Sequence, residues 1–413
     1  MQVGSAPQAP VQEGLDKPPE TEKKIEDDEF KRVYYPKFVY SWGLNNYGQL
    51  GRPKNIKPTL LPKTVPIEDA EILAVSVTQI VTTPGNTFIL TDLGVVYGNG
   101  VNNIRQLAGG EFLSHKFYKL DNLEDHVVKE LSVFWDTCYA VTKTGVALGW
   151  GANAYGQLGR DPAVMFSARA PVEMYGSPEN PVVQVAGGQR HCVILTKKGR
   201  VLTCGDFKNR QLGRTHELYD YVPREVETLR NVKQIAAGQH HNLALVRTRN
   251  EMKVYAWGWN KDGQCGDNPA TTGEHAPVPF EVQFSVTIEK GAILKCGWRH
   301  SGLKLVTGEL FLWGDNKLGQ QGQEERIPNE PFPKRIKNLS SDEEVKDFGL
   351  GLGHTVVILK SGMVVAWGDN VDGCCGIGHQ NSPVIMPLKI CCGIRRISTK
   401  VFAGYKQSFA VTI

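Results

Sequence analysis

The chain has 413 residues, of which 41% are hydrophobic and 22% charged, and its formal net charge at pH 7 is +4. No apolar run approaches the roughly 18 residues that a membrane-spanning helix needs, so we expect no membrane span. So mild a net charge argues against nucleic acid as a partner. Without a secretory signal, we expect a cytoplasmic protein and leave the nucleus open.

Residues 1–33 differ in composition from the rest of the chain. They are rich in Pro, Glu and Lys and hold eight acidic against five basic side chains. Such a segment is too polar to bury a core. We predict a disordered acidic tail over residues 1–33 and one folded domain over residues 34–413.

A phrase that begins Trp42-Gly43-Leu44-Asn45 and ends in Gly-Gln-Leu-Gly recurs seven times along this domain. The second-position glycines are Gly43, Gly100, Gly151, Gly205, Gly258, Gly314 and Gly368. Their spacing of 51 to 57 residues is typical of propeller blades rather than of helical repeats. The sequence therefore predicts one closed repeat body.

A second anchor precedes most copies of the phrase. It reads Gly-x-x-His, and its last position, which we call the slot, holds Asn86, Thr137, His191, His241, His300, His354 and Gln407. Between slot and phrase lie two β-rich runs around a glycine-containing turn, as in 193–204, which is the pattern of a hairpin. Further apolar runs such as 182–185 complete four strands per blade.

The two ends of the domain complement each other. The strand expected at 38–42 has no preceding hairpin partner, and the strand expected at 408–413 has no following one. We therefore predict that the N-terminal strand completes the C-terminal blade. This closure would leave no long exposed sheet edge. The predicted fold is all-β: a single seven-bladed propeller with four-stranded blades.

The recurring aromatic, imidazole and thiol side chains have structural interpretations. Tryptophans at the Trp-Gly position should pack between blades. Slot histidines should each bind a buried backbone group within their own blade. The nine cysteines fall largely in repeat positions and lack the C-x-x-C spacing of zinc sites, so we expect buried reduced thiols. No nucleophile elbow or recurring carboxylate pair is visible. We therefore expect no catalytic residue, metal or cofactor.

These motifs resemble the regulator of chromosome condensation type repeat family, whose hallmark runs from Gly-x-x-His-Thr to Trp-Gly-x-Asn-x-x-Gly-Gln-Leu-Gly. The resemblance covers the chain from about residue 38 to the end. Residues 255–264, Tyr-Ala-Trp-Gly-Trp-Asn-Lys-Asp-Gly-Gln, nearly copy the consensus. In style the chain is most similar to the secretion-regulating, exchange-factor-like members. The family implies the propeller fold but hosts several functions.

The loops just before the slots should share one face of the propeller, around its centre. They are rich in Trp, Tyr and Arg, the residue types that dominate binding hot spots. The candidate partner-binding residues are Trp135, Asp136, Arg190, His240, Trp298, Arg299, Tyr405 and Lys406. The alternative is that Trp135, Trp298 and Tyr405 only cap the blade ends.

Three functions are compatible with this surface. The first is a non-catalytic adaptor or scaffold that binds a protein partner, including a small GTPase. The second, implied by the resemblance, is a guanine-nucleotide exchange factor, although the acidic residue that follows the slot-loop glycine in the founding member has no counterpart here. The third is a light-sensing dimer. The phrase Gly297-Trp298-Arg299-His300 resembles one that a plant ultraviolet receptor repeats in successive blades, but here it occurs once.

Overall fold

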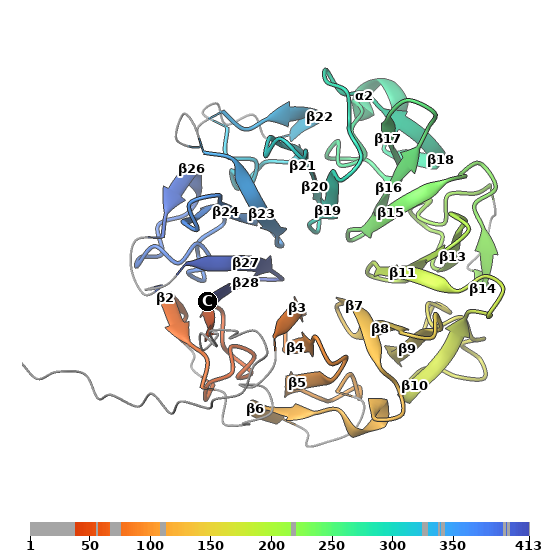
Figure 1. Cartoon of the computed structure of the whole chain (residues 1–413), viewed down its shortest axis with the longest axis horizontal. Coiled ribbons are helices and arrows are strands. Elements are labelled where there is room, and N and C mark those ends of the chain that lie inside the picture. The colour runs from red at the N-terminus through yellow and green to blue at the C-terminus, as the bar shows by residue number, and fades with distance from the viewer. Residues whose placement is uncertain are drawn as a thin grey trace, which may run out of the picture. The chain divides into compact units, whose positions relative to one another are not determined.

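The computed structural model describes residues 38–54, 57–66, 76–107, 113–215, 220–323, 329–337, 339, 343–390, 394 and 397–412. They form seven four-stranded antiparallel sheets arranged as a ring around a central channel (Figure 1). The predicted all-β propeller of seven blades is confirmed. The tail predicted at 1–33 lies outside the described residues, and the domain boundary at residue 34 stays a prediction.

Six sheets take four consecutive strands each, ordered from the channel outward. The first three are β3 Val77–Thr82, β4 Asn86–Thr91, β5 Val96–Val101, β6 Leu113–Lys119; β7 Val128–Phe134, β8 Thr137–Thr142, β9 Ala147–Ala152, β10 Ser167–Tyr175; and β11 Val182–Gly187, β12 His191–Thr196, β13 Val201–Gly205, β14 Asp220–Glu225. The next three are β15 Val232–Ala237, β16 His241–Arg247, β17 Met252–Trp259, β18 His275–Val282; β19 Ile293–Cys296, β20 His300–Lys304, β21 Leu310–Asp315, β22 Asn329–Arg335; and β23 Val345–Leu350, β24 His354–Leu359, β25 Val364–Gly368, β26 Val384–Lys389. Short helices occur at η1 Asp121–Leu123 and α2 Pro269–Thr272.

The seventh sheet joins the two ends of the domain. Its strands, again from the channel outward, are β27 Ser398–Ala403, β28 Gln407–Thr412, β1 Phe38–Gly43 and β2 Thr59–Thr64. Strand β1 pairs antiparallel with β28 over six residue pairs, from Phe38 opposite Thr412 to Gly43 opposite Gln407. The predicted ring closure is therefore confirmed.

The tryptophans of the Trp-Gly phrase bridge neighbouring blades, as expected. Trp42, Trp150, Trp257, Trp313 and Trp367 are fully buried. Each indole Nε1–H donates to the backbone carbonyl at the Gln position of the preceding blade's Gly-Gln-Leu-Gly loop, at 2.8 to 3.1 Å. Each ring therefore both fills the space between blades and satisfies a buried acceptor.

The slot histidines differ from expectation. Their Nε2 atoms bond side chains of the next blade, not backbone of their own: His191 to Asn242 at 2.7 Å, His241 to Ser301 at 2.9 Å, and His354 to Ser408 at 2.9 Å. The expectation of a bond within the blade was wrong because the imidazole reaches across the seam between blades. The slot histidines thus link neighbouring blades by hydrogen bonds between side chains.

Two blades lack the tryptophan, with Asn99 at its position in the β3–β6 blade and Cys204 in the β11–β14 blade, and in the second case a residue of the preceding blade compensates. Cys204 stands at the Trp position of the β11–β14 blade, and its Sγ lies 3.7 Å from the carbonyl oxygen of Gln157. The hydroxyl of Tyr139, on β8 of the preceding blade, donates to the same carbonyl at 3.3 Å. Tyr139 is fully buried. Its ring therefore supplies bulk and a hydrogen bond that an indole supplies elsewhere.

The innermost strands are also tied to each other along the channel. The Gln79 amide donates to the carbonyl of Leu131 at 2.7 Å and accepts from its N–H at 2.9 Å. Gln234 binds both backbone groups of Leu294 in the same way, at 2.9 and 3.0 Å. Lys400 on β27 donates to the carbonyl of Thr78 on β3 at 2.8 Å, which completes the circle. These bonds make the ring stiff.

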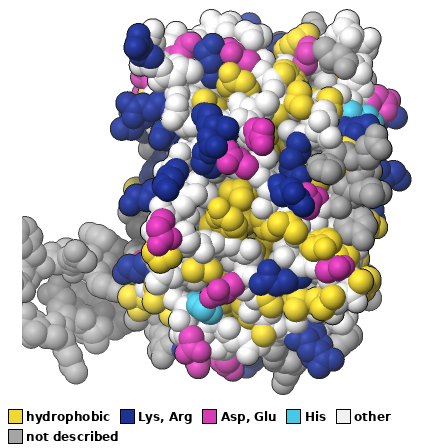
Figure 2. All heavy atoms as spheres, turned by 90° about the vertical axis from the view of Figure 1, so that its right-hand side faces the viewer, with side chains coloured by type: hydrophobic (Ala, Val, Ile, Leu, Met, Phe, Trp, Pro, Cys, Tyr) yellow, Lys and Arg dark blue, Asp and Glu magenta, His cyan; other side chains and the backbone are white. Residues whose placement is uncertain are grey.

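The outer wall is mixed in character. On the side of β14 and β18, Lys, Arg, Asp and Glu side chains are interspersed around apolar ones (Figure 2). The exposed apolar side chains of these two strands include Val222 and Val278. Within the described part of the chain, no helix is long and apolar enough to cross a membrane.

Candidate protein-binding face

The slot loops of adjacent blades are joined by backbone hydrogen bonds at one rim of the channel. The N–H of Gln189 donates to the carbonyl of Gln239 at 3.0 Å, and the N–H of Gln239 donates to that of Trp298 at 2.8 Å. The N–H of Trp298 in turn donates to Gly351 at 3.2 Å. The loops therefore form a continuous belt on a rigid base, which is the arrangement that positions binding residues.

The phrase that follows each hairpin supports this belt from beneath. Gly258 has a φ of 105°, and a Cβ there would lie 2.4 Å from the carbonyl oxygen of His240. Only glycine combines this left-handed backbone with so close an approach. The glycine of the Trp-Gly phrase is thus required for the slot loop to sit where it does.

Four aromatic rings meet at the centre of the belt, and we call them the aromatic hub. The Trp298 ring lies 4.8 Å from Phe134, 5.5 Å from Trp135 and 5.0 Å from Tyr405, measured between centroids. These residues come from three blades. Trp298 also borders the channel, a cavity of ≈ 380 Å³ lined by all seven innermost strands. The hub therefore covers one mouth of that channel.

Three of the predicted residues, Trp135, Trp298 and Tyr405, thus belong to the hub, where the rings of Trp135 and Tyr405 contact that of Trp298. Trp135 is 42% exposed and has a φ of 55°, a left-handed conformation that is rare for a bulky residue. Trp298 and Tyr405 are half-buried. A contiguous aromatic surface with one exposed indole is suited to a protein contact.

Arg190, His240 and Arg299 follow one another on successive blades beside the hub. The guanidinium of Arg190 lies 4.3 Å from the Tyr155 ring centroid, and that of Arg299 lies 4.9 Å from the Trp259 centroid. The ring of His240 is 5.6 Å from that of Trp259. Burial, together with the nearby His191, Arg190 and Arg299, lowers the pKa of His240 to about 3, so this imidazole is neutral at pH 7.

The remaining predicted residues carry the other charges of the face. Arg299 and Lys317 both pair with the buried carboxylate of Asp262. Lys406 pairs with Asp372 at 2.6 Å. Burial raises the pKa of Asp136, an effect that its own hydrogen bonds and the charge of Arg190 oppose.

The sequence analysis missed the residues that support these predicted ones. Tyr155, Asp262 and Asp372 lie in loops that join a blade's third and fourth strands, and Trp259 is the last residue of the third strand β17. These loops emerge at the same rim as the slot loops. The sequence carried a signal for these residues, because they follow the Trp-Gly phrase near the end of a third strand. The first and third strands of a blade run in the same direction and therefore end at the same rim.

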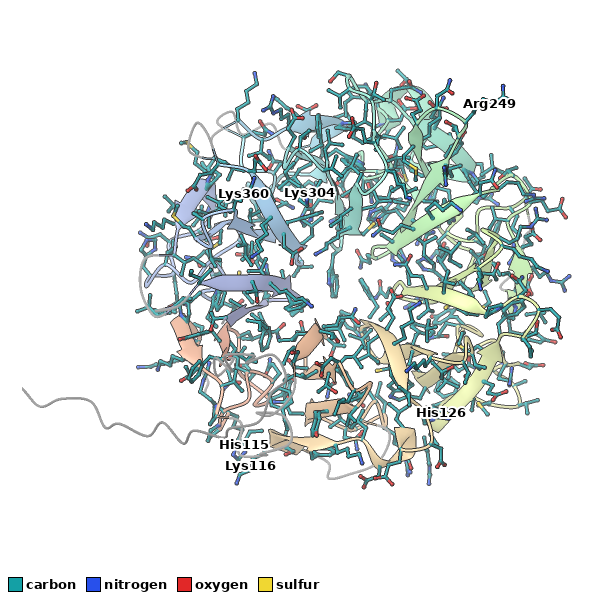
Figure 3. The ribbon with its side chains drawn as sticks, viewed as in Figure 1. His115, Lys116, His126, Arg249, Lys304 and Lys360 are labelled. Atoms are coloured by element: carbon teal, nitrogen blue, oxygen red, sulfur yellow. The ribbon has the colours of Figure 1, made fainter. Side chains whose placement is uncertain are left out.

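Other titratable residues lie away from this face. Figure 3 shows His115, Lys116, His126 and Arg249 toward the perimeter of the ring. Among the described residues, no three His, Cys, Asp or Glu side chains converge where they could hold a metal ion. The site's chemistry is accordingly that of aromatic and charged contacts.

A family model described as the RCC1-like domain matches residues 38–410. The chain belongs to this family. As in the family's other propellers, one repeated blade builds the whole domain, and members of the RCC1-like family include proteins of different functions.

Three relatives illustrate this range. The chain is 31% identical over 310 residues to the ultraviolet-B receptor UVR8 of Arabidopsis thaliana, covering 74% of this chain and 66% of that protein. It is 27% identical over 376 residues to the secretion-regulating guanine nucleotide exchange factor of Mus musculus, covering 83% and 76%. It spans 20% of the human probable E3 ubiquitin-protein ligase HERC6, at 30% identity over 213 residues covering 51% of this chain.

Solved structures share the fold. Human WBSCR16 is similar with a TM-score of 0.77 at 22% identity, covering 92% of this chain and 99% of that one. Prp20p from Saccharomyces cerevisiae, studied for its binding to Gsp1p and histones, is similar with a TM-score of 0.78 at 21% identity, covering 92% of each chain. These likenesses show the fold alone.

Proposed function

We propose that the protein is a non-catalytic adaptor that holds a protein partner on the face formed by its slot loops. The observation that carries this proposal is the aromatic hub, a partly exposed cluster around Trp298 mounted on a hydrogen-bonded belt. Clustered Trp, Tyr and Arg side chains dominate the energy of protein interfaces. A rigid platform also loses little conformational entropy when it binds.

The proposal extends to the compartment. All seven described cysteines are free, and six of them are buried. Reduced thiols are typical of reducing compartments. We therefore infer a cytoplasmic or nuclear location, with the partner in the same compartment.

The hub is tested by a paired substitution. Replacing Trp135 and Tyr405 together by Ser should abolish capture of specific partners from cell extract, measured by quantitative mass spectrometry, and leave the melting temperature within a few degrees. The matched control replaces Leu93 and Val127, two exposed apolar residues in turns at the opposite rim. If the Trp135/Tyr405 variant retained every partner that the control retains, the face would be wrongly assigned.

Guanine-nucleotide exchange is the second candidate, favoured by similarity to the secretion-regulating exchange factor. Exchange needs no nucleophile, because a factor that binds the nucleotide-free GTPase more tightly shifts the population toward release. We expect one member of a panel of small GTPases carrying fluorescent nucleotide to release it at least about tenfold faster with the protein. The Trp135/Tyr405 variant should lose this effect. If the protein changed the rate of nucleotide release from no GTPase in the panel, the exchange-factor hypothesis would fail and the adaptor function would remain.

A further inference from the structure

Three arginines on the same face share an uncommon arrangement. Each guanidinium lies on an aromatic ring at the end of a third strand or in the loop that follows it: Arg190 on Tyr155 at 4.3 Å, Arg210 on Phe207 at 4.6 Å, and Arg299 on Trp259 at 4.9 Å. Arg190 and Arg210 belong to the β11–β14 blade, and Arg299 lies two blades further along the ring. We call these three residues the stacked arginines.

The sector around the stacked arginines holds more positive than accessible negative charge. Among the described residues, Arg190, Lys208 and Arg210 form no ion pair. The carboxylate of Asp262 is only 1% exposed and is shared by Arg299 and Lys317. Asp206 is also buried, and its carboxylate accepts the backbone N–H of Lys208. Asp136, which is partly exposed, interacts electrostatically with Arg190, and the sector still carries more positive than negative charge at its surface.

Stacking prepares a guanidinium for a carboxylate without using its donors. The ring covers one face of the planar group, so in Arg190 and Arg210 the N–H groups at its edges remain available for paired hydrogen bonds, whereas Arg299 already donates to Asp262. The ring also restricts the side chain before binding, which reduces the entropy lost on association. Two polar atoms near Arg190 or within the stacked arginines themselves, Nδ1 of His240 and Nε of Arg299, are buried without a hydrogen-bond partner in the described structure.

We propose that the stacked arginines bind a carboxylate-rich segment of the protein partner, with acidic side chains meeting Arg190, Arg210 and Arg299 in turn while apolar side chains cover the aromatic hub. This inference rests on the proposed function and names the chemistry of the partner. Electrostatic complementarity of this kind sets the specificity and the association rate of a complex.

The geometry favours carboxylates over nucleic acid or a phosphate group. Bases would need free aromatic faces for stacking, and the guanidiniums cover one face of Tyr155, Phe207 and Trp259. A phosphate site needs several donors that converge on one point. The three guanidiniums instead come from two blades, each on its own ring, which suits separate acidic side chains along one extended segment.

Fluorescence anisotropy with labelled peptides tests the proposal. The probe is a peptide of five Asp-Glu-Ser repeats, compared with five Asn-Gln-Ser repeats, five Asn-Gln-phosphoserine repeats and a single-stranded DNA of 15 nucleotides. We expect the acidic peptide alone to bind, with an affinity that weakens as ionic strength rises. Equal binding of the amide peptide, or tighter binding of the phosphopeptide or the DNA, would overturn the proposal.

Variants separate a specific role of the arginines from general charge. Arg190→Gln with Arg210→Gln should weaken binding of the acidic peptide at least about tenfold. The control, Arg224→Gln with Arg335→Gln, removes the same charge from exposed residues of the outer strands β14 and β22 and should change affinity less than about twofold. Arg190→Lys with Arg210→Lys keeps the charge but loses the planar guanidinium and its paired N–H donors, and should still weaken binding.

Two results would contradict the inference: equal effects of the two Gln pairs, or full affinity in the Lys pair. Circular dichroism and the melting temperature of each variant show that it is folded. Failure of this inference can be distinguished from failure of the proposed adaptor function. If the acidic peptide does not bind while the Trp135/Tyr405 variant still loses its captured partners, the platform stands and only the partner chemistry is wrong.

Discussion

Single carbonyl groups organise the contacts between blades. In five seams a backbone carbonyl receives the indole N–H of the next blade, and in the seam before the β11–β14 blade the acceptor is the carbonyl of Gln157. The Cys204 thiol reaches this carbonyl across the seam only at 3.7 Å, and Tyr139, on the same blade as Gln157, donates to it as well, at 3.3 Å. A buried carbonyl without a donor would cost stability, so the substitution at one residue is compensated by a residue 65 positions earlier.

We predict that Tyr139→Phe lowers the free energy of unfolding by about 1 kcal/mol, since it removes one buried hydrogen bond and little volume. Urea denaturation measures the change. The control Tyr47→Phe, at a residue that is 45% exposed, should stay within about 0.5 kcal/mol of the parent. Equal stability of parent and Tyr139→Phe would show that the hydroxyl does not compensate for the indole N–H that is missing at this carbonyl.

At the scale of elements, the strand that closes the ring has a distinct role. Strand β1 lies between β2 and β28, so it is hydrogen-bonded on both sides although it begins the domain. Tyr40 is opposite Thr64 on one side and Ala410 on the other. Without β1, two strands would present unpaired edges, which invite association with other chains.

A proline in β1 should therefore open the ring. Tyr40→Pro removes a backbone donor from a central strand, at a cost of about 3 kcal/mol or more. The control is Met386→Pro in β26, an outer strand whose residue 386 lies in a stretch without paired positions. We expect broader thermal unfolding and aggregation, measured by calorimetry and light scattering, for Tyr40→Pro only. A cooperative transition near that of the control would argue against closure by β1.

Across the whole molecule, three of the four buried slot histidines make stability depend on pH in one direction, while the pKa of the fourth, His354, is raised because the lowering by burial is outweighed by Cys374 and Asp369. Burial lowers the pKa of His191 to about 4, and of His241 and His300 to about 3, from an ordinary value near 6.5. Below pH 6.5 the unfolded chain therefore binds protons that the folded chain does not. Stability is complete above pH 6.5 and falls as the pH approaches 4, by about 1.4 kcal/mol per pH unit for each unbalanced proton.

Glu130 opposes this trend, because burial raises its pKa to about 7 and the folded state then holds the extra proton between pH 7 and 4.5. Three histidines outweigh it, so we expect the melting temperature to fall from pH 6.5 to pH 4.5. His300→Gln, which copies the natural slot residue Gln407, should reduce the dependence of the melting temperature on pH by the contribution of one histidine. A melting temperature that is constant over this range would refute the assignment of neutral slot histidines.

Much of this architecture could be predicted because it is encoded locally and repeatedly. The Trp-Gly spacing indicated seven blades, and the missing partner strands at 38–42 and 408–413 predicted their pairing. The slot loops were also placed correctly on one face, since loops at equivalent positions of a repeat emerge together. The stacked arginines were not predicted, because Tyr155, Phe207 and Trp259 precede or follow their partners by three to forty residues.

The amino-acid sequence alone determined the blade count, the closure and the composition of the binding face, because a strand pattern with a fixed period has one way to bury its apolar sides. Only the tertiary structure decided which side chains meet. The hub brings Phe134, Trp298 and Tyr405 together from three blades, and the slot histidines bond across seams rather than within blades. Such contacts depend on ring curvature, which no single repeat encodes.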